Sequence, residues 1–457
     1  MLQFEGQETP LVGIMLVGWL PVVFVMFALM RPRRAVLVSF LFAWLFLPIA
    51  SYDLPLIPDY NKMTATCISV VAGVLVFDLQ RLLQFRLKWF DLPTVIFCIV
   101  TPIMSSLTNG LGVYDGLSSS LDFVFFWGIP YFIGRFYFSD PKGLRELAIG
   151  IFIGGLVYVP LCLYEIRMSP QLHHMAYGYH QHAFMQTVRG DGTWRPMVFM
   201  QHGLMVGMWM ITAALVGVWL WQTGGLKRVL GVPVAVFVVP LMGTALLVRS
   251  IGATILFVVG LAVLMLTKWF RTLWIMLGIQ GILVLYLFVR VTGIWDGAGL
   301  VDLAEQTVGP ARAASLETRI DSDRILSAKA WDRPLFGWGH WGRNRAFDEE
   351  TGARAIADSL WVIIFGSHGL VGLVPMFLII LLPPILFTRR FPVSLWIHPM
   401  TSPALVLSLV LVLWMIDNTL NAMINPIFLV IAGGLNGLHA SPGTMPNSLR
   451  VASPPPV

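Results

Sequence analysis

Long apolar runs alternate with short polar segments along almost the whole chain. The runs approach the length of about 20 residues that a helix needs to cross the ~30 Å hydrocarbon core of a bilayer. They predict thirteen membrane-spanning helices, at residues 11–30, 35–51, 63–79, 92–108, 119–138, 146–165, 196–221, 229–248, 250–267, 272–291, 358–387, 402–417 and 420–437. The expected fold is an all-α, polytopic transmembrane helical bundle of about 12–13 spans.

The composition supports a membrane protein over a set of soluble domains. Hydrophobic residues make up 57% of the chain, charged residues only 12%, and the mean hydropathy is +0.78. A soluble domain carries about 25% charged residues. We therefore expect residues 1–437 to form one membrane domain.

The charge of the polar loops predicts how the chain is oriented. Lys and Arg accumulate in cytoplasmic loops of membrane proteins. Every second loop is basic: Arg31 to Arg34, Arg81 to Lys88, Lys142 to Arg145, Lys227 with Arg228, Lys268 to Arg271, and Arg389 with Arg390. This bias accounts for the net charge of +6 without a nucleic-acid partner.

The two ends of the chain fit the same orientation. The basic cluster follows the first apolar run and does not precede it, unlike the basic region of a cleavable signal peptide. The N-terminus is therefore expected outside the cytoplasm. Residues 438–457, rich in Pro and Ser, are expected to form a disordered cytoplasmic tail.

Two polar segments on the predicted outer face are long enough to carry function. One spans about residues 166–195, and the other, residues 292–357, forms a large extracytoplasmic loop. The chain contains no Walker loop, dinucleotide-binding glycine motif or His-Glu-x-x-His motif, which argues against an ATP-driven pump. Its three cysteines are too far apart for a metal motif. We expect no cofactor and no metal.

Arginines on the predicted outer face are candidates for binding an anion. Arg249 lies alone within a long apolar stretch, where it either clamps an anion in a polar cavity or extends to the lipid headgroups. Arg195 precedes a span that carries His202, and Arg290 ends another span on the same face. Guanidinium groups match phosphate oxygens, so several of them together predict a diphosphate-binding cavity.

The large loop contributes two more candidate arginines. The segment that carries Arg319 and Arg324 has no Gly or Pro through Trp331, which predicts a helix ending before Pro334. Arg319 and Asp323 are also spaced to form an ordinary i,i+4 ion pair on a solvated face, and this alternative stays open.

A Gly- and Trp-rich segment follows, before the next span. Its glycines allow tight turns or close backbone approach. Trp338 and Trp341, with His340 between them, are candidates for stacking on a sugar ring, or belong to an interfacial tryptophan belt. Asp358 opens the next span, either as a helix N-cap or as a general base.

Four histidines lie within ten residues of the first outer segment. They are His173, His174, His180 and His182. Their spacing matches no tight metal site, and the neighbouring Tyr and Met residues favour an interfacial amphipathic helix.

The outer segments together resemble the signature region of O-antigen ligases and O-antigen/exopolysaccharide polymerases. In this family an Arg lies about fifteen residues before a Pro-Leu-Phe-Gly-x-Gly motif, as Arg319 does before Pro334, and a later helix carries Gly-hydrophobic-x-Gly, here Gly369 to Gly372. The sequence around Arg249 resembles the family's other arginine motif, and residues 195–202 resemble its entry to a span. The family's His-Asn pair is replaced here by Asp358 and Ser359.

The resemblance implies a metal-independent, inverting glycosyltransferase at the outer face of the bacterial cytoplasmic membrane. Its donor would be an undecaprenyl-diphosphate-linked oligosaccharide, with membrane lipids and a chain-length regulator or other polysaccharide-assembly proteins as partners. The expected catalytic residues are Arg249, Arg319 and Asp358, and the expected substrate-binding residues are Arg195, His202, Arg324, Trp338, His340 and Trp341.

The sequence is compatible with three functions. The missing His favours a polymerase over a ligase of the same family. A transporter for a lipid-linked intermediate or a small anion explains the spans equally well, but not the long charged loop. The sequence shows no convincing internal repeat of the kind common in transporters.

Overall fold

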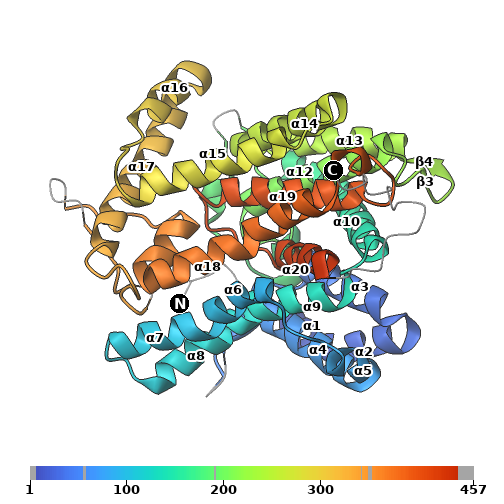
Figure 1. The fold of residues 1–457 in the computed structure, drawn as a ribbon, viewed down its shortest axis with the longest axis horizontal. Helices are drawn as coiled ribbons and strands as arrows, with labels where there is room; N and C mark the ends of the chain where they lie inside the picture. Colours follow the sequence, from blue (N-terminus) through green and yellow to red (C-terminus); the bar gives the residue numbers. More distant parts are fainter. Residues whose placement is uncertain (1–6, 55–57, 190–191, 341, 348–351, 441–457) are drawn as a thin grey trace, which may run out of the picture.

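The protein is an all-α, multi-pass membrane protein (Figure 1). A computed structural model describes residues 7–54, 58–189, 192–340, 342–347 and 352–440. Helical residues occupy each of the thirteen predicted ranges, so the predicted fold class is confirmed. Residues 441–457 of the predicted tail lie outside the described residues, and the last helix continues to Ala440, beyond the predicted boundary at residue 437.

The first part of the chain builds the lower layer in Figure 1 and crosses to the centre. Its α-helices are α1 (Pro10–Val17), α2 (Trp19–Leu29), α3 (Pro32–Phe46), α4 (Lys62–Phe77), α5 (Leu79–Leu83), α6 (Leu92–Val95), α7 (Thr101–Thr108), α8 (Val113–Phe123), α9 (Ile129–Tyr137), α10 (Pro141–Met168) and α11 (Leu172–Tyr177). The π-helical turns η2 (Ile96–Val100) and η3 (Val124–Gly128) and the 3₁₀ turns η1 (Trp89–Asp91) and η4 (Phe184–Thr187) complete it. Strands β1 (Ser51–Tyr52) and β2 (Tyr60–Asn61) pair antiparallel.

The second part of the chain supplies the upper layer and the large loop. Its helices are α12 (Gly203–Gln222), α13 (Val234–Leu247), α14 (Ile251–Phe270), α15 (Trp274–Val291), α16 (Ala298–Val308), α17 (Pro310–Ala330), α18 (Leu360–Arg390), α19 (Ser402–Asp417) and α20 (Pro426–Ala440), with the 3₁₀ turn η5 (Val393–Leu395). Strands β3 (Arg228–Val229) and β4 (Val232–Pro233) form a small antiparallel hairpin. In Figure 1, α16 and α17 project from one end of the bundle.

Several helices have the length and apolar character needed to cross a membrane. In the described part of the chain, seven helices meet both criteria: Pro10–Leu29, Trp89–Thr108, Pro141–Met168, Gly203–Gln222, Ile251–Phe270, Trp274–Val291 and Leu360–Arg390. Four shorter apolar helices join them, at Lys62–Phe77, Val234–Leu247, Ser402–Asp417 and Pro426–His439.

Helix α12 forms the centre of the bundle. Its apolar window is 94% buried, and it contacts α10, α13, α14 and α19. Small residues allow these close approaches: a Cβ added at Gly155 of α10 would lie 2.3 Å from the Cβ of Ala213. Close packing through small residues is typical of helix association in membranes.

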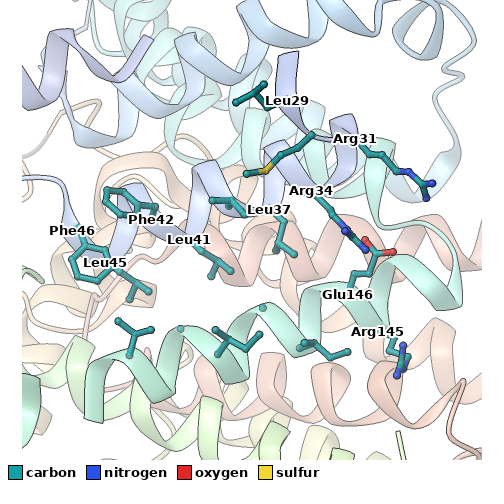
Figure 2. Close-up of a pocket in the computed structure, with 17 residues that line it drawn as sticks. Leu29, Arg31, Arg34, Leu37, Leu41, Phe42, Leu45, Phe46, Arg145 and Glu146 are labelled. Atoms are coloured by element: carbon teal, nitrogen blue, oxygen red, sulfur yellow. The ribbon is translucent and has the colours of Figure 1, made fainter. Parts of the chain in front are cut away.

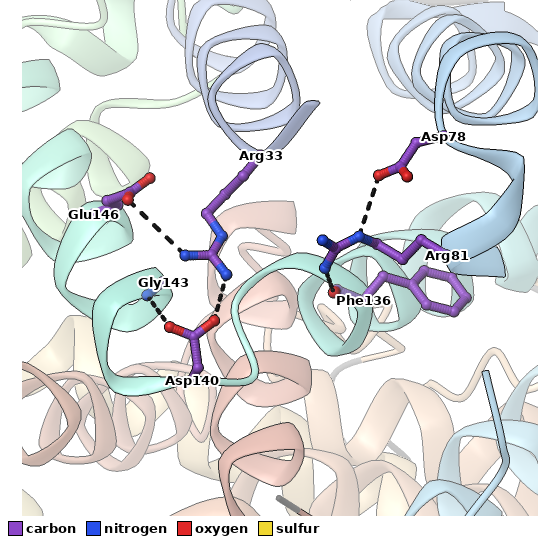
Figure 3. A network of polar contacts seen from close by, with 7 residues as sticks. All are labelled: Arg33, Asp78, Arg81, Phe136, Asp140, Gly143 and Glu146. Atoms are coloured by element: carbon purple, nitrogen blue, oxygen red, sulfur yellow. Dashed lines mark hydrogen bonds and ion pairs between the residues drawn. The ribbon is translucent and has the colours of Figure 1, made fainter. Parts of the chain in front are cut away.

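The basic loops gather at one end of the bundle, where polar contacts join neighbouring helices. Arg33 at the start of α3 pairs with Asp140, the N-cap of α10, and Arg81 donates to the carbonyl of Phe136 at 3.0 Å (Figure 3). Lys268 donates to Gln222 at 3.0 Å on the same side. We call this side the basic end. Its position at the cytoplasmic face stays a prediction from loop charge.

Helix α18 is broken at Gly369, and the preceding Gly-rich segment fills the break. Gly369 has φ 65° and ψ −163°, a region that essentially only glycine adopts. The N–H groups of Trp338 and Gly339 donate to the carbonyls of Gly366 and Ser367, both at 2.9 Å. In return, the N–H of Leu370 donates to the carbonyl of Pro334 at 2.7 Å. The segment from Pro334 to Gly339 therefore provides hydrogen-bond partners for backbone groups next to the break in α18.

Two predicted spans begin too early in the sequence. Helix α12 starts at Gly203, not at residue 196, because the buried carboxylate of Glu165 accepts the N–H groups of Met197 and Val198 and holds this stretch outside a helix. Helix α20 starts at Pro426, not at residue 420. The loop helix predicted through Arg319 is confirmed as α17, whereas α16 was not predicted.

Replacing Gly369 by Ala is expected to destabilise the protein. A Cβ at this position would lie 2.3 Å from the carbonyl carbon and oxygen of Leu335, and the backbone strain alone costs about 1–3 kcal/mol. The measurement is the apparent Tm in detergent, detected by a thiol-reactive dye that reports exposure of the buried cysteines Cys67, Cys98 and Cys162.

The matched control is Gly281→Ala in α15, where an added Cβ meets nothing within 4 Å. We expect the control to unfold at the wild-type temperature or slightly above it. Equal apparent Tm values for Gly369→Ala and Gly281→Ala would show that the break in α18 does not require glycine.

Candidate functional site

Arg319 lies where three separate elements meet at the end opposite the basic end. Its Nη1 donates to the carbonyl of Leu420 at 3.2 Å and to Oδ1 of Asn421 at 2.9 Å. Its Nε lies 3.6 Å from Oδ2 of Asp358. The two side chains remain 29% and 43% exposed, so the ion pair is open to solvent and to a ligand.

The pairing of Asp358 settles two alternatives left open by the sequence. Ser359, not Asp358, is the N-cap of α18, and it makes no side-chain cap bond, so the N-cap alternative for Asp358 is wrong. The i,i+4 pair of Arg319 with Asp323 is also absent. Instead, the hydroxyl of Ser359 donates to Oδ2 of the buried Asp323 at 2.7 Å. Arg319 therefore pairs across the site and not along its own helix.

Asp323 and Arg290 support this site structurally. Burial raises the pKa of the Asp323 carboxyl to about 7, although Ser359 and Arg290 act in the opposite direction. Arg290 is buried and donates to the carbonyls of Trp295, Asp296 and Ile320. Because these bonds fasten the large loop to α15, Arg290 has a structural role in this fold.

His202 connects Arg319 with the other arginines. Its Nδ1 accepts the N–H of Leu204 at 3.1 Å as the N-cap of α12. Burial, together with the nearby His182, Arg195, Arg319 and Arg189, lowers the pKa of His202 to about 3. Several cationic side chains therefore lie near one half-buried imidazole.

Arg195 and Arg249 are joined through the backbone. Nε and Nη2 of Arg195 donate to the carbonyl of Arg249 at 3.3 and 3.1 Å. Arg249 has φ 56° in the turn between α13 and α14, and its side chain is exposed. The side chain of Arg195 lies over Gly203, where an added Cβ would be 2.3 Å from its Cδ. The structure thus brings Arg195, His202, Arg249, Arg319 and Asp358 to one end of the bundle.

The remaining predicted site residues lie elsewhere or are already engaged. Arg324 lines a separate groove of about 360 Å³ with four acidic residues, on the side of α17 that faces α16. Trp338 donates to the carbonyl of Lys329, and the cations of Lys329 and Arg333 lie 4.7 and 4.5 Å from its ring centre. His340 is exposed, and Trp341 lies outside the described residues.

Two residues of the site were missed from the sequence. Asn421 accepts from Arg319, and its Nδ2 donates to Oδ1 of Asp417 at 3.0 Å. The polar run from Asp417 to Asn425, inside an otherwise apolar C-terminal stretch, is the signal that indicates them. In the sequence this run was divided between two predicted spans.

The histidine cluster packs as part of the fold. The ring nitrogens of His173 contact the carbonyl of Tyr179 at 3.0 Å and the N–H of Ile49 at 3.2 Å. His174 stacks on His180, with ring centres 4.7 Å apart. Among the described residues, no group of three or more His, Cys, Asp or Glu side chains is placed to hold a metal ion.

Asp323 predicts a pH dependence of stability. Its raised pKa means that the folded state binds a proton more tightly than the unfolded state, whose Asp titrates near its usual 3.8. This carboxyl therefore costs stability as the pH rises from about 4 to about 7. Asp323→Asn is expected to raise the apparent Tm relative to wild type more at pH 8 than at pH 5.

The matched control is Asp321→Asn, on the same helix, where the side chain is 55% exposed. It should change the apparent Tm similarly at both pH values. A Tm difference for Asp323→Asn that does not vary with pH would contradict the raised pKa.

Comparison with protein-family models and with curated proteins finds no match to this sequence.

Proposed function

We propose that the protein is a membrane-embedded glycosyltransferase that extends a bacterial polysaccharide from lipid-diphosphate-linked units. The observation that carries the proposal is the half-exposed Arg319–Asp358 pair beside Arg195, His202 and Arg249. An arginine next to an accessible carboxylate supplies both an anion-binding group and a proton acceptor at one site.

The proposed chemistry follows from these two groups. The acceptor sugar's hydroxyl attacks the anomeric carbon of the donor, and the bond from that carbon to the diphosphate oxygen breaks. The hydroxyl proton passes to the Asp358 carboxylate, and the electron pair leaves with the lipid diphosphate. Arg319 and Arg249 stabilise the charge that grows on this leaving group. We place the reaction at the outer face of the cytoplasmic membrane because the site lies opposite the basic end.

A transporter is the second candidate function. Helix α18 is discontinuous at Gly369, and broken helices are common at the binding sites of transporters. A ligase of the same family would share the donor and differ in its acceptor. Experiments on purified protein separate these possibilities.

Arg319→Ala is expected to lower the turnover of polymer formation by about 10²-fold or more, because a charge that stabilises the leaving group is lost. Arg319→Lys should recover only part of the activity, since lysine lacks the planar fork. Arg324→Ala is the contrast on the same helix, and we expect it to retain activity because its side chain lies in a separate acidic groove. The readout is glycan length in membranes with matched protein levels. Equal losses in Arg319→Ala and Arg324→Ala would argue against a site specific to Arg319.

Purified protein in detergent is expected to lengthen lipid-linked repeat units without ATP, an ion gradient or a divalent metal. The diphosphate bond of the donor supplies the driving force. Extension should therefore release undecaprenyl diphosphate and continue unchanged in excess EDTA. Asp358→Asn should slow extension because an amide cannot accept the proton. Asp358 is not a helix cap, so this substitution removes no cap bond.

The same assay distinguishes the alternatives. A transporter does not lengthen the glycan, with or without sealed compartments. A ligase transfers a single glycan to a different acceptor lipid. Activity that disappeared with EDTA and returned with zinc would refute the metal-independent mechanism.

A further inference from the structure

An open apolar groove runs between α3 and α10, starting at the basic end (Figure 2). Its volume is about 1030 Å³, at the upper end of the range of about 300–1,000 Å³ typical of ligand sites. Leu37, Leu41 and Phe42 of α3 form one wall, and Ile153 and Val157 of α10 form the other. Phe42, Ile153 and Val157 are 39%, 43% and 45% exposed, so the groove opens outward from the bundle.

Two glycines lie where the groove-forming helices pack closely together. Gly150 and Gly154 line it on α10, facing leucines of α3. A Cβ added at Gly150 would lie 2.9 Å from Cδ1 of Leu41, and one at Gly154 would lie 3.1 Å from Cδ1 of Leu45. A larger residue at either position would collide with these leucines, so both glycines allow α3 to pack closely against α10 beneath the groove.

Three arginines surround one end of the groove. Arg31 and Arg34 are exposed, and neither guanidinium has a hydrogen bond or an ion pair with the described part of the chain. Arg145 donates from Nε to the carbonyl of Gly225 at 2.9 Å. Figure 2 shows these side chains at one end and Phe42 and Phe46 toward the other. The groove is therefore cationic at its mouth and apolar along its length.

The acidic residues at this mouth are already paired. Arg33 bonds Asp140, and its Nη1 lies 3.9 Å from Glu146, which also lines the groove (Figure 3). With Arg31, Arg34 and Arg145 the mouth has four arginines against two carboxylates, so a net positive charge remains for a ligand.

The length of the groove favours a lipid acyl chain over a transmembrane helix as its ligand. From Arg145 to Val157 the helix extends roughly 18 Å, at a rise of about 1.5 Å per residue. One leaflet of the hydrocarbon core is about 15 Å thick, half of ~30 Å. A partner transmembrane helix would need the full thickness. We propose that this groove binds an anionic phospholipid of the leaflet next to the basic end, with its phosphate on Arg31, Arg34 and Arg145 and an acyl chain along α10. Basic pockets between membrane helices bind anionic headgroups in this way.

The test uses purified full-length protein in a neutral detergent, with phosphatidylglycerol or phosphatidylcholine of identical acyl chains as probes. Native mass spectrometry measures bound lipid, and the thiol-dye assay measures apparent Tm. We expect at least tenfold more bound phosphatidylglycerol than phosphatidylcholine. The double variant Arg31→Gln/Arg34→Gln should remove this preference, while the control Arg86→Gln, an exposed basic residue outside the groove, should keep it.

A second pair of variants tests the acyl-chain position. Val157→Trp should reduce binding of both lipids by filling the groove, whereas Ile282→Trp, on an exposed position of α15, should not. Equal binding of the two lipids by wild type would overturn the proposal, as would unchanged selectivity in the arginine double variant. Displacement of phosphatidylglycerol by equimolar undecaprenyl phosphate would assign the groove to a polyprenyl lipid instead. None of these results depends on the proposed transferase activity.

Discussion

The unpaired backbone groups at the break in α18 are the constraint on which the candidate site depends. Unsatisfied N–H and C=O groups cost several kcal/mol inside a membrane, so irregular backbone persists there only where other protein groups satisfy it. Here the segment from Pro334 to Gly339 supplies those partners. The hydroxyl of Ser105 adds bonds to the carbonyls of Phe336 and Ser367 from α7. Because this segment leads from α17 towards α18, closing the break also fixes where Arg319 and Asp358 lie.

Buried polar side chains fix the rest of that end in a similar way. Glu165 at the end of α10 accepts three backbone N–H groups from Leu172, Met197 and Val198. These bonds hold the segment that carries Arg195 and ends at His202. Arg290 fastens the large loop by three carbonyl bonds. The cationic side chains of the candidate site therefore extend from backbone that is rigidly held.

Sequence patterns predicted the helices well and the site only in part. Hydropathy locates spans because a long apolar run in a membrane protein usually forms a membrane-spanning helix. It placed α12 too early, because the mostly apolar residues before this helix are held in an irregular conformation by the buried Glu165. It placed α20 too early, because the apolar residues of the C-terminal stretch outweigh the polar run from Asp417 to Asn425 that separates α19 from α20. The role of Asn421 depends on contact with Arg319, which lies far away in the sequence. Likewise, Arg319 and Arg324 look equivalent along the chain and are separated only by the helix face on which each lies.

The loose ion pair at the centre of the site has a consequence for the proposed reaction. Half-exposed pairs such as Arg319 with Asp358 contribute about 0–1 kcal/mol, and the separation of 3.6 Å lacks the two short bonds of a strong pair. A diphosphate carries more charge and offers a better match to the guanidinium fork than one carboxylate does. Donor binding would then draw Arg319 away from Asp358 and leave that carboxylate without its cation. That carboxylate would then be free to accept a hydrogen bond from the acceptor hydroxyl, so binding of the donor would itself prepare the base.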